Sequence, residues 1–128
     1  MSEKTVAEKL LIKPDKKVLF VNAPQDLAEL LGSLPAGVIM LNEASEPADI
    51  ILAFIKNRQE LEEQLANLKA ALDPKGALWI TYYKGTARIK TNIHRDSINA
   101  YAKTLGLTGV MMISVDQDWS ALRLKITR

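Results

Sequence analysis

The sequence predicts an α/β fold, in which helices pack against a mostly parallel β-sheet. Short continuous apolar runs alternate with segments of helical periodicity, and such runs are typical of strands covered on both faces. The last two runs, 110–115 and 121–126, are separated by one short polar segment, which favours an antiparallel hairpin. The length of 128 residues suits one domain, 1–128.

The N-terminal segment predicts a helix, a strand and a second helix. Thr5 and Glu8 have the spacing of a capping box, so a short helix is expected to begin there. The run 18–21 predicts the first strand. Pro24 suits the first position of the next helix, and Gly32 is expected to end it.

The middle of the chain predicts two strands and the longest helix. The runs 38–41 and 49–55 are predicted as buried strands, and the segment between them is too short for a full helix. Asn57 and Glu60 form a second capping-box pair. The helix that follows has an apolar face formed by Leu61, Leu65, Leu68 and Leu72. Gly76 is expected to contribute to its end.

The last part of the chain predicts strand 77–83, a helix over about 93–105 and the C-terminal hairpin. The sheet therefore has about six strands. Trp79 lies inside an apolar strand and is predicted to be core. Met111 and Met112 are predicted to fill core space in the hairpin.

Composition narrows the class of function. Hydrophobic residues make up 48% and charged residues 25%, and no run approaches the length of a membrane span, so no membrane partner is expected. Cysteine is absent, which excludes disulfides and cysteine nucleophiles. The N-terminus has no apolar signal-peptide core, so a cytoplasmic protein is expected. A net charge of +2 does not by itself imply nucleic acid.

Two segments resemble S-adenosylmethionine-dependent methyltransferases. Residues 13–22 read Lys-Pro-Asp-Lys-Lys-Val-Leu-Phe-Val-Asn, and residues 72–80 read Leu-Asp-Pro-Lys-Gly-Ala-Leu-Trp-Ile. They are similar to the first strand and to the late L-x-P-x-G-x-L strand of that superfamily. The resemblance covers about residues 10–128 and implies a Rossmann-like, reduced methyltransferase-type sheet. More closely, the pattern at 115–122 is similar to that of a family of small uncharacterised bacterial proteins.

Two departures from the methyltransferase pattern bear on activity. The loop 22–26 lacks the glycines that let the backbone approach the cofactor, and Pro24 supplies no backbone N–H. Asn42 stands where the resemblance implies a ribose-binding acid, with Glu43 one residue late. We therefore expect a non-catalytic binding or regulatory module for a small anionic ligand or a protein partner, with no catalytic residue and no cofactor. A methyltransferase with an atypical S-adenosylmethionine loop is the enzyme alternative.

The candidate ligand site lies beyond the carboxyl ends of the predicted parallel strands, where open α/β sheets bind ligands. Cations there are suited to a phosphate or a carboxylate, which makes a small anionic ligand the expected partner. The predicted ligand-binding residues are Asn22, Gln25, Asn42, Lys84, Arg88 and Lys90. The alternative is a solvated loop whose lysines only aid solubility.

The remaining candidates each carry two interpretations. His94, the only histidine, is either a capping or a catalytic residue, and capping is favoured. Asp116 and Asp118 are too few for a metal site, and no metal is expected. Trp119 either folds back over the hairpin or contacts a protein partner.

Two further partner classes stay open. Nucleic acid is an alternative, through Lys84, Arg88, Lys90 and Arg95 with Tyr83 stacking on a base, although it is not the favoured one. Association into a homodimer through a sheet edge or a helix face is the other.

Overall fold

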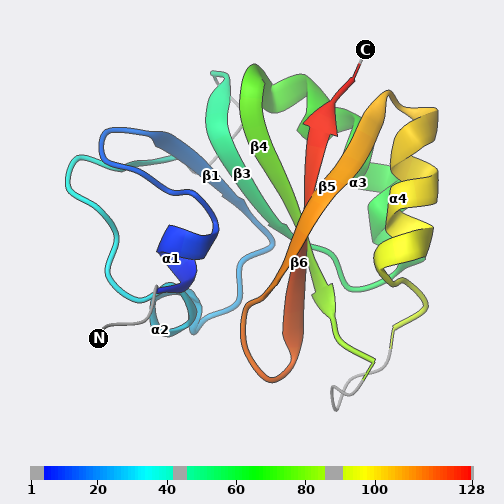
Figure 1. Cartoon of the computed structure of the whole chain (residues 1–128), viewed down its shortest axis with the longest axis horizontal. Helices are drawn as coiled ribbons and strands as arrows, with labels where there is room; N and C mark the ends of the chain where they lie inside the picture. The colour runs from blue at the N-terminus through cyan, green and yellow to red at the C-terminus, as the bar shows by residue number, and fades with distance from the viewer. Residues whose placement is uncertain (1–4, 42–45, 86–90, 128) are drawn as a thin grey trace.

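The computed structural model describes residues 5–41, 46–85 and 91–127, and these build a six-stranded sheet flanked by helices (Figure 1). The strands are β1 (Lys17–Val21), β2 (Ile39–Leu41), β3 (Ala48–Phe54), β4 (Leu72–Tyr83), β5 (Leu107–Ser114) and β6 (Trp119–Ile126). The helices are α1 (Val6–Lys9), α2 (Leu27–Leu31), α3 (Arg58–Ala71) and α4 (Arg95–Thr104).

The sheet has the order β2-β1-β3-β4-β6-β5. Strands β1 to β4 pair in parallel, and β6 pairs antiparallel with both β4 and β5. The predicted mostly parallel sheet with an antiparallel C-terminal hairpin is therefore confirmed. The direction of winding reverses between β1 and β3, because the chain continues from β1 outward to β2 and then returns to the other side of β1.

Each face of the sheet carries its own apolar core. One core lies under α3 and α4 and includes Leu61, Leu65, Ile80 and Ile98. The other lies on the side of α1 and α2 and includes Leu10, Leu31, Phe54 and Trp79. Adjacent strand residues point to opposite faces, so Tyr82 joins the first core and Tyr83 the second. Trp79 is fully buried, as predicted, and its Nε1–H donates to the carbonyl of Leu10 at 2.9 Å.

The predicted capping of α1 is confirmed and the start of α2 is corrected. Glu8 N donates to the Thr5 hydroxyl at 3.2 Å, and Thr5 N donates to the Glu8 carboxylate at 3.1 Å. Pro24 does not begin α2, because a turn from Pro24 to Leu27 precedes the helix. Gly32 ends α2 with φ +75°, a left-handed conformation that favours glycine.

The junction between α3 and β4 differs from the prediction. Leu72 is the first residue of β4 and does not belong to the helix. A Cβ on Gly76 would lie 2.6 Å from the carbonyl oxygen of Asp49. Gly76 is therefore required for the close approach of β4 to β3 and is not a helix stop.

The two edge strands correct two predictions of burial. In β2, Ile39 is 47% exposed and Met40 is 53% exposed, although the run 38–41 is continuously apolar. In β5, Met111 and Met112 are also exposed, so they do not fill the core. Both strands have a neighbour on one side only. Apolarity alone does not reveal this position in the sheet.

Candidate functional site

Asn22 occupies the point at which the sheet reverses its winding. It follows β1 directly and adopts a left-handed backbone conformation with φ +56°. Its Nδ2 donates to the Phe54 carbonyl at the end of β3, at 3.3 Å, and to Gln64 Oε1 of α3, at 2.9 Å. In open α/β sheets the crevice at this reversal is the usual ligand site. The Asn22 amide therefore links the end of β1 to β3 and α3 at this reversal.

An aromatic cluster fills the neighbouring part of the same rim. Trp119 stacks on Tyr83 with ring centroids 4.1 Å apart, and it meets Phe54 edge-on at 5.0 Å. Trp119 is 8% exposed. Asp116 Oδ1 accepts hydrogen bonds from the Trp119 and Asp118 backbone amides, which holds the turn in this shape. The tryptophan is thus folded back on the sheet, and contact with a partner would require it to leave the stack.

The predicted ligand-binding residues do not converge where the structure describes them. Lys84 Nζ donates to the hydroxyl of Ser114 at the end of β5, at 2.6 Å, whereas Asn22 reaches toward β3. Because β3 separates β1 from β4, and β5 lies farther out still, the two side chains are directed apart. Gln25 is exposed in the turn before α2. Asn42, Arg88 and Lys90 lie outside the described residues.

Burial sets the ionisation of the two tyrosines near this rim. Burial raises the pKa of Tyr83 above its ordinary value of 10.0, and the charges of Asp118 and Glu60 raise the pKa further. Burial also raises the pKa of Tyr82. Both phenols are therefore protonated at neutral pH and do not supply a base.

Three other features bear on the class of site. His94 is the N-cap residue of α4, where its backbone N–H donates to the hydroxyl of Ser97 at 2.9 Å, in agreement with a capping position. Within the described ranges, no three His, Asp or Glu side chains stand close enough together to hold a metal ion. No helix in the described part of the chain is both long and apolar enough to cross a bilayer.

A cleft lies at the other end of the parallel strands, where they begin. It was not predicted from the sequence. It has a volume of about 410 Å³ and lies where β3 begins and β4 approaches it. The cationic residues that line it are Lys13, Lys16, Lys75 and Arg123. One signal was available in the sequence. Arg123 stands in a strand with the period-2 pattern, on the same face as Trp119 and Ala121, where a charge is unexpected.

Solved structures identify the class of fold. A ribosomal protein L11 methylase from Lactobacillus delbrueckii subsp. bulgaricus matches 94% of this chain and 74% of its own, with TM-score 0.62 and 11% identity. A SAM-dependent methyltransferase from Aquifex aeolicus matches 95% and 90%, with TM-score 0.60 and 16% identity. The structure described as a DhpI-SAH complex matches 94% and 82%, with TM-score 0.65 and 10% identity. The chain has a methyltransferase-like, Rossmann-like fold.

Family membership is shown independently of the fold. The model of the family described as "Protein of unknown function (DUF3052)" matches residues 8–128, and the chain belongs to this family. No curated protein matches the sequence. The resemblance to a methyltransferase-like family of uncharacterised proteins is therefore confirmed. The low sequence identities to the solved methyltransferases support a shared fold and no shared activity.

Proposed function

We propose that this protein is a non-catalytic, methyltransferase-like binding module and that its ligand is a small anionic molecule. The observation that carries the proposal is the Asn22 amide, which bridges the end of β3 and helix α3 at the sheet reversal. A cofactor bound between the end of β1 and α3 would have to displace both hydrogen bonds. The loop after Asn22 contains Pro24 and no glycine, so its backbone offers fewer donors to a ligand.

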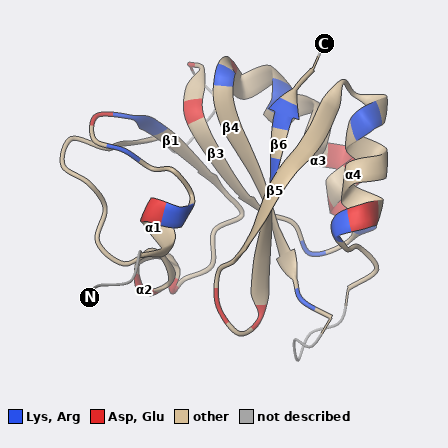
Figure 2. Ribbon diagram, in the orientation of Figure 1, with Lys and Arg blue, Asp and Glu red and all other residues tan. Residues whose placement is uncertain are grey.

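An anionic ligand is supported by the distribution of charge. Lysine and arginine positions, blue in Figure 2, occur on the ribbon at the end of the sheet where β1 and β4 begin and β6 ends. The cleft at this end is lined by four cationic and two acidic side chains, which leaves an excess of positive charge. Such a surface attracts anions and can bind them through charge-assisted hydrogen bonds.

The experiment that tests the absence of methyl transfer is a titration with S-adenosylhomocysteine, followed by calorimetry and by thermal melting. We expect no binding heat and no change in melting temperature for the wild-type protein. A ligand at about 100 times its dissociation constant stabilises a protein by roughly 2.7 kcal/mol. For a domain of this size that is about 10 °C. A shift of that size would contradict the proposal and favour a methyltransferase with an atypical loop.

The same titration is carried out on the variant Asn22→Gly to test the role of the Asn22 side chain. Glycine tolerates the left-handed backbone of Asn22 and lacks the bridging amide. If the variant binds S-adenosylhomocysteine and the wild type does not, Asn22 is the group that closes the crevice. If neither binds, the closure does not depend on this side chain alone.

A further inference from the structure

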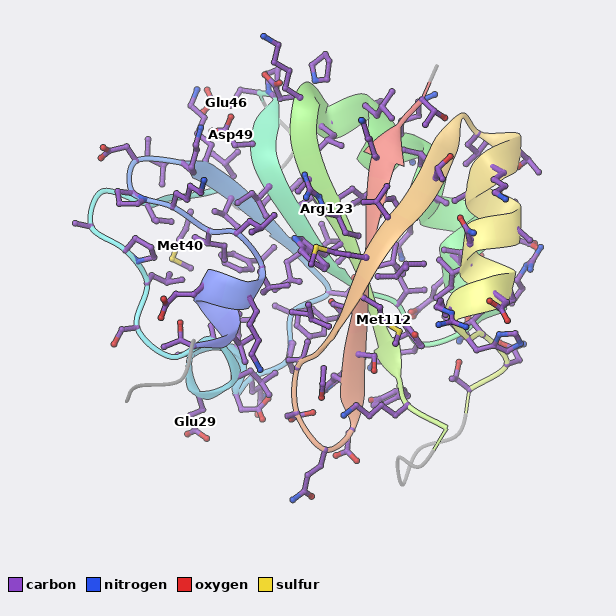
Figure 3. The ribbon with its side chains drawn as sticks, viewed as in Figure 1. Glu29, Met40, Glu46, Asp49, Met112 and Arg123 are labelled. Atoms are coloured by element: carbon purple, nitrogen blue, oxygen red, sulfur yellow. The ribbon has the colours of Figure 1, made fainter. Side chains whose placement is uncertain are left out.

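The cleft lies at the end of the parallel strands away from Asn22, and four separate segments of the chain build it. The loop before β1 supplies Lys13 and Lys16, and the start of β3 supplies Asp49. The start of β4 supplies Lys75, and β6 supplies Arg123. Figure 3 labels Arg123 on β6, and it labels Asp49 near the start of β3. A volume of about 410 Å³ falls within the range of small-molecule sites, which is roughly 300–1,000 Å³.

The cations of the cleft have no partners within the described part of the chain. No ion pair joins the side chains of Lys13, Lys16, Lys75 or Arg123 to any described carboxylate. The Nε–H of Arg123 is buried and has no hydrogen-bond acceptor among these residues. A buried donor without an acceptor costs free energy, so this guanidinium is poised to gain from a bound acceptor.

The two acids of the cleft are already engaged with the backbone. Asp49 Oδ2 accepts from the Lys17 amide at 2.9 Å, and Asp73 Oδ1 accepts from the Lys75 amide at 2.9 Å. These bonds hold the loop before β1 and the start of β4 in place. Among the described residues, neither carboxylate forms an ion pair with a cationic side chain of the cleft.

The walls of the cleft are constrained by the backbone. Leu11, which lines it, adopts a left-handed backbone conformation with φ +66°. The buried bond from Trp79 Nε1 to the Leu10 carbonyl anchors the start of this loop. Gly76 brings β4 against the carbonyl of Asp49, where no Cβ fits. The cationic side chains therefore project from a fixed frame.

We propose that this cleft binds a small phosphorylated molecule, with Arg123 and Lys75 holding the phosphoryl group and Lys13 and Lys16 adding charge at the mouth. The guanidinium presents a planar set of donors that matches phosphate oxygens, and lysine ammonium groups complement it. The cleft is larger than one phosphate ion, which leaves room for the rest of the molecule. The class of ligand, a small anion, comes from the proposed function, on which this inference rests. The inference adds the cleft as the place where that ligand binds.

The test is calorimetric titration of the full chain with inorganic pyrophosphate at low ionic strength, for the wild type and for Arg123→Gln. We expect saturable binding by the wild type and at least a tenfold weaker affinity for the variant, with partial recovery in Arg123→Lys. Lys103→Gln is the matched control, because it removes one exposed positive charge from α4, outside the cleft. This control should bind pyrophosphate like the wild type.

Amide chemical shifts measured during the same titration locate the site. We expect the largest changes at 11–16 and 73–77, and none at Asn22 or Lys84. If Arg123→Gln does not fold, judged by circular dichroism, the pair of single variants Lys75→Gln and Lys13→Gln takes its place.

Three results would overturn the proposed cleft. The first is no saturable binding of pyrophosphate. The second is equal weakening by Arg123→Gln and Lys103→Gln, which would show only a general effect of charge. The third is Arg123-dependent binding of single-stranded RNA without pyrophosphate binding, which would assign the cleft to nucleic acid. Binding of S-adenosylhomocysteine would overturn the proposed function alone, so the two failures are distinguishable.

Discussion

At the scale of single residues, Asn22 shows how an asparagine can occupy a left-handed backbone position. Glycine is the residue that adopts a left-handed backbone without steric cost, and asparagine adopts it more readily than most others. Here the conformation is accompanied by two side-chain hydrogen bonds, to Phe54 and to Gln64. The bonds tie the end of β1 to β3 and α3.

Two Asn22 variants separate the contribution of the backbone conformation to the free energy of unfolding from the contribution of the side-chain hydrogen bonds. Asn22→Ala loses the hydrogen bonds and retains a Cβ in the left-handed region, whereas Asn22→Gly loses only the bonds. We expect Asn22→Ala to be less stable than Asn22→Gly by about 1 kcal/mol. Urea denaturation of both variants measures the difference. Equal stabilities would show that the left-handed backbone of Asn22 carries no strain.

At the scale of secondary structure elements, α3 illustrates which local signals determine a helix. The Asn57 side chain accepts from the Glu60 amide at 2.9 Å, which satisfies one of the free donors at the helix start. The Glu60 carboxylate accepts from the Lys56 amide at 2.7 Å and does not bond to Asn57 itself. The reciprocal bond of the predicted capping box is therefore displaced by one residue, but the helix begins where predicted.

Removing this cap tests its contribution to stability. Asn57→Ala should lower the free energy of unfolding by about 1 kcal/mol, because the Glu60 amide then loses its acceptor. Asn67→Ala is the matched control, since Asn67 is exposed in the interior of the same helix and alanine is the better helix former. The control should be as stable as the wild type or slightly more so. If both variants lose the same free energy, the cap has no specific role.

Local sequence patterns predicted the helices and strands well. They did not predict which strands lie at the edges of the sheet. Capping pairs and apolar spacing are properties of consecutive residues, which is why α1, α3 and the hairpin were predictable. The exposure of Met40 and Met112 depends on strand order, which the chain fixes only through distant pairing. The same limit applies to the site. Arg123 and Lys13 are far apart in sequence, so their shared cleft becomes visible only in the folded sheet.

At the scale of the whole molecule, burial on both faces of β4 links stability to alkaline pH. Tyr82 and Tyr83 are 5% and 8% exposed, in the two separate cores. Burial is the main cause that raises the pKa of each phenol above the 10.0 of a free tyrosine. For Tyr82 the charge of Arg95 opposes this rise and that of Asp96 adds to it.

The sign of the effect follows from the protons that each state binds. Between pH 10.0 and the higher pKa of the folded state, the folded protein keeps phenol protons that the unfolded chain has lost. The stabilisation from these groups is therefore complete below pH 10 and is lost as the pH rises above it. The slope for each tyrosine is at most about 1.4 kcal/mol per pH unit.

Urea unfolding measures this loss when it is followed from about pH 7 to about pH 11. The upper limit lies about one unit above the ordinary pKa of tyrosine. We expect Tyr82→Phe to flatten the alkaline decline in the free energy of unfolding, although it also removes the hydroxyl that contacts Met112 Sδ at 3.0 Å. Tyr101→Phe, on the partly exposed face of α4, is the matched control and should decline like the wild type. Parallel alkaline slopes for the wild type and Tyr82→Phe would show that this buried phenol does not couple folding to pH. A flattened slope would instead place the coupling in the core beneath α3 and α4, none of whose residues lines the proposed anion cleft, so that anion binding and alkaline stability can be altered independently.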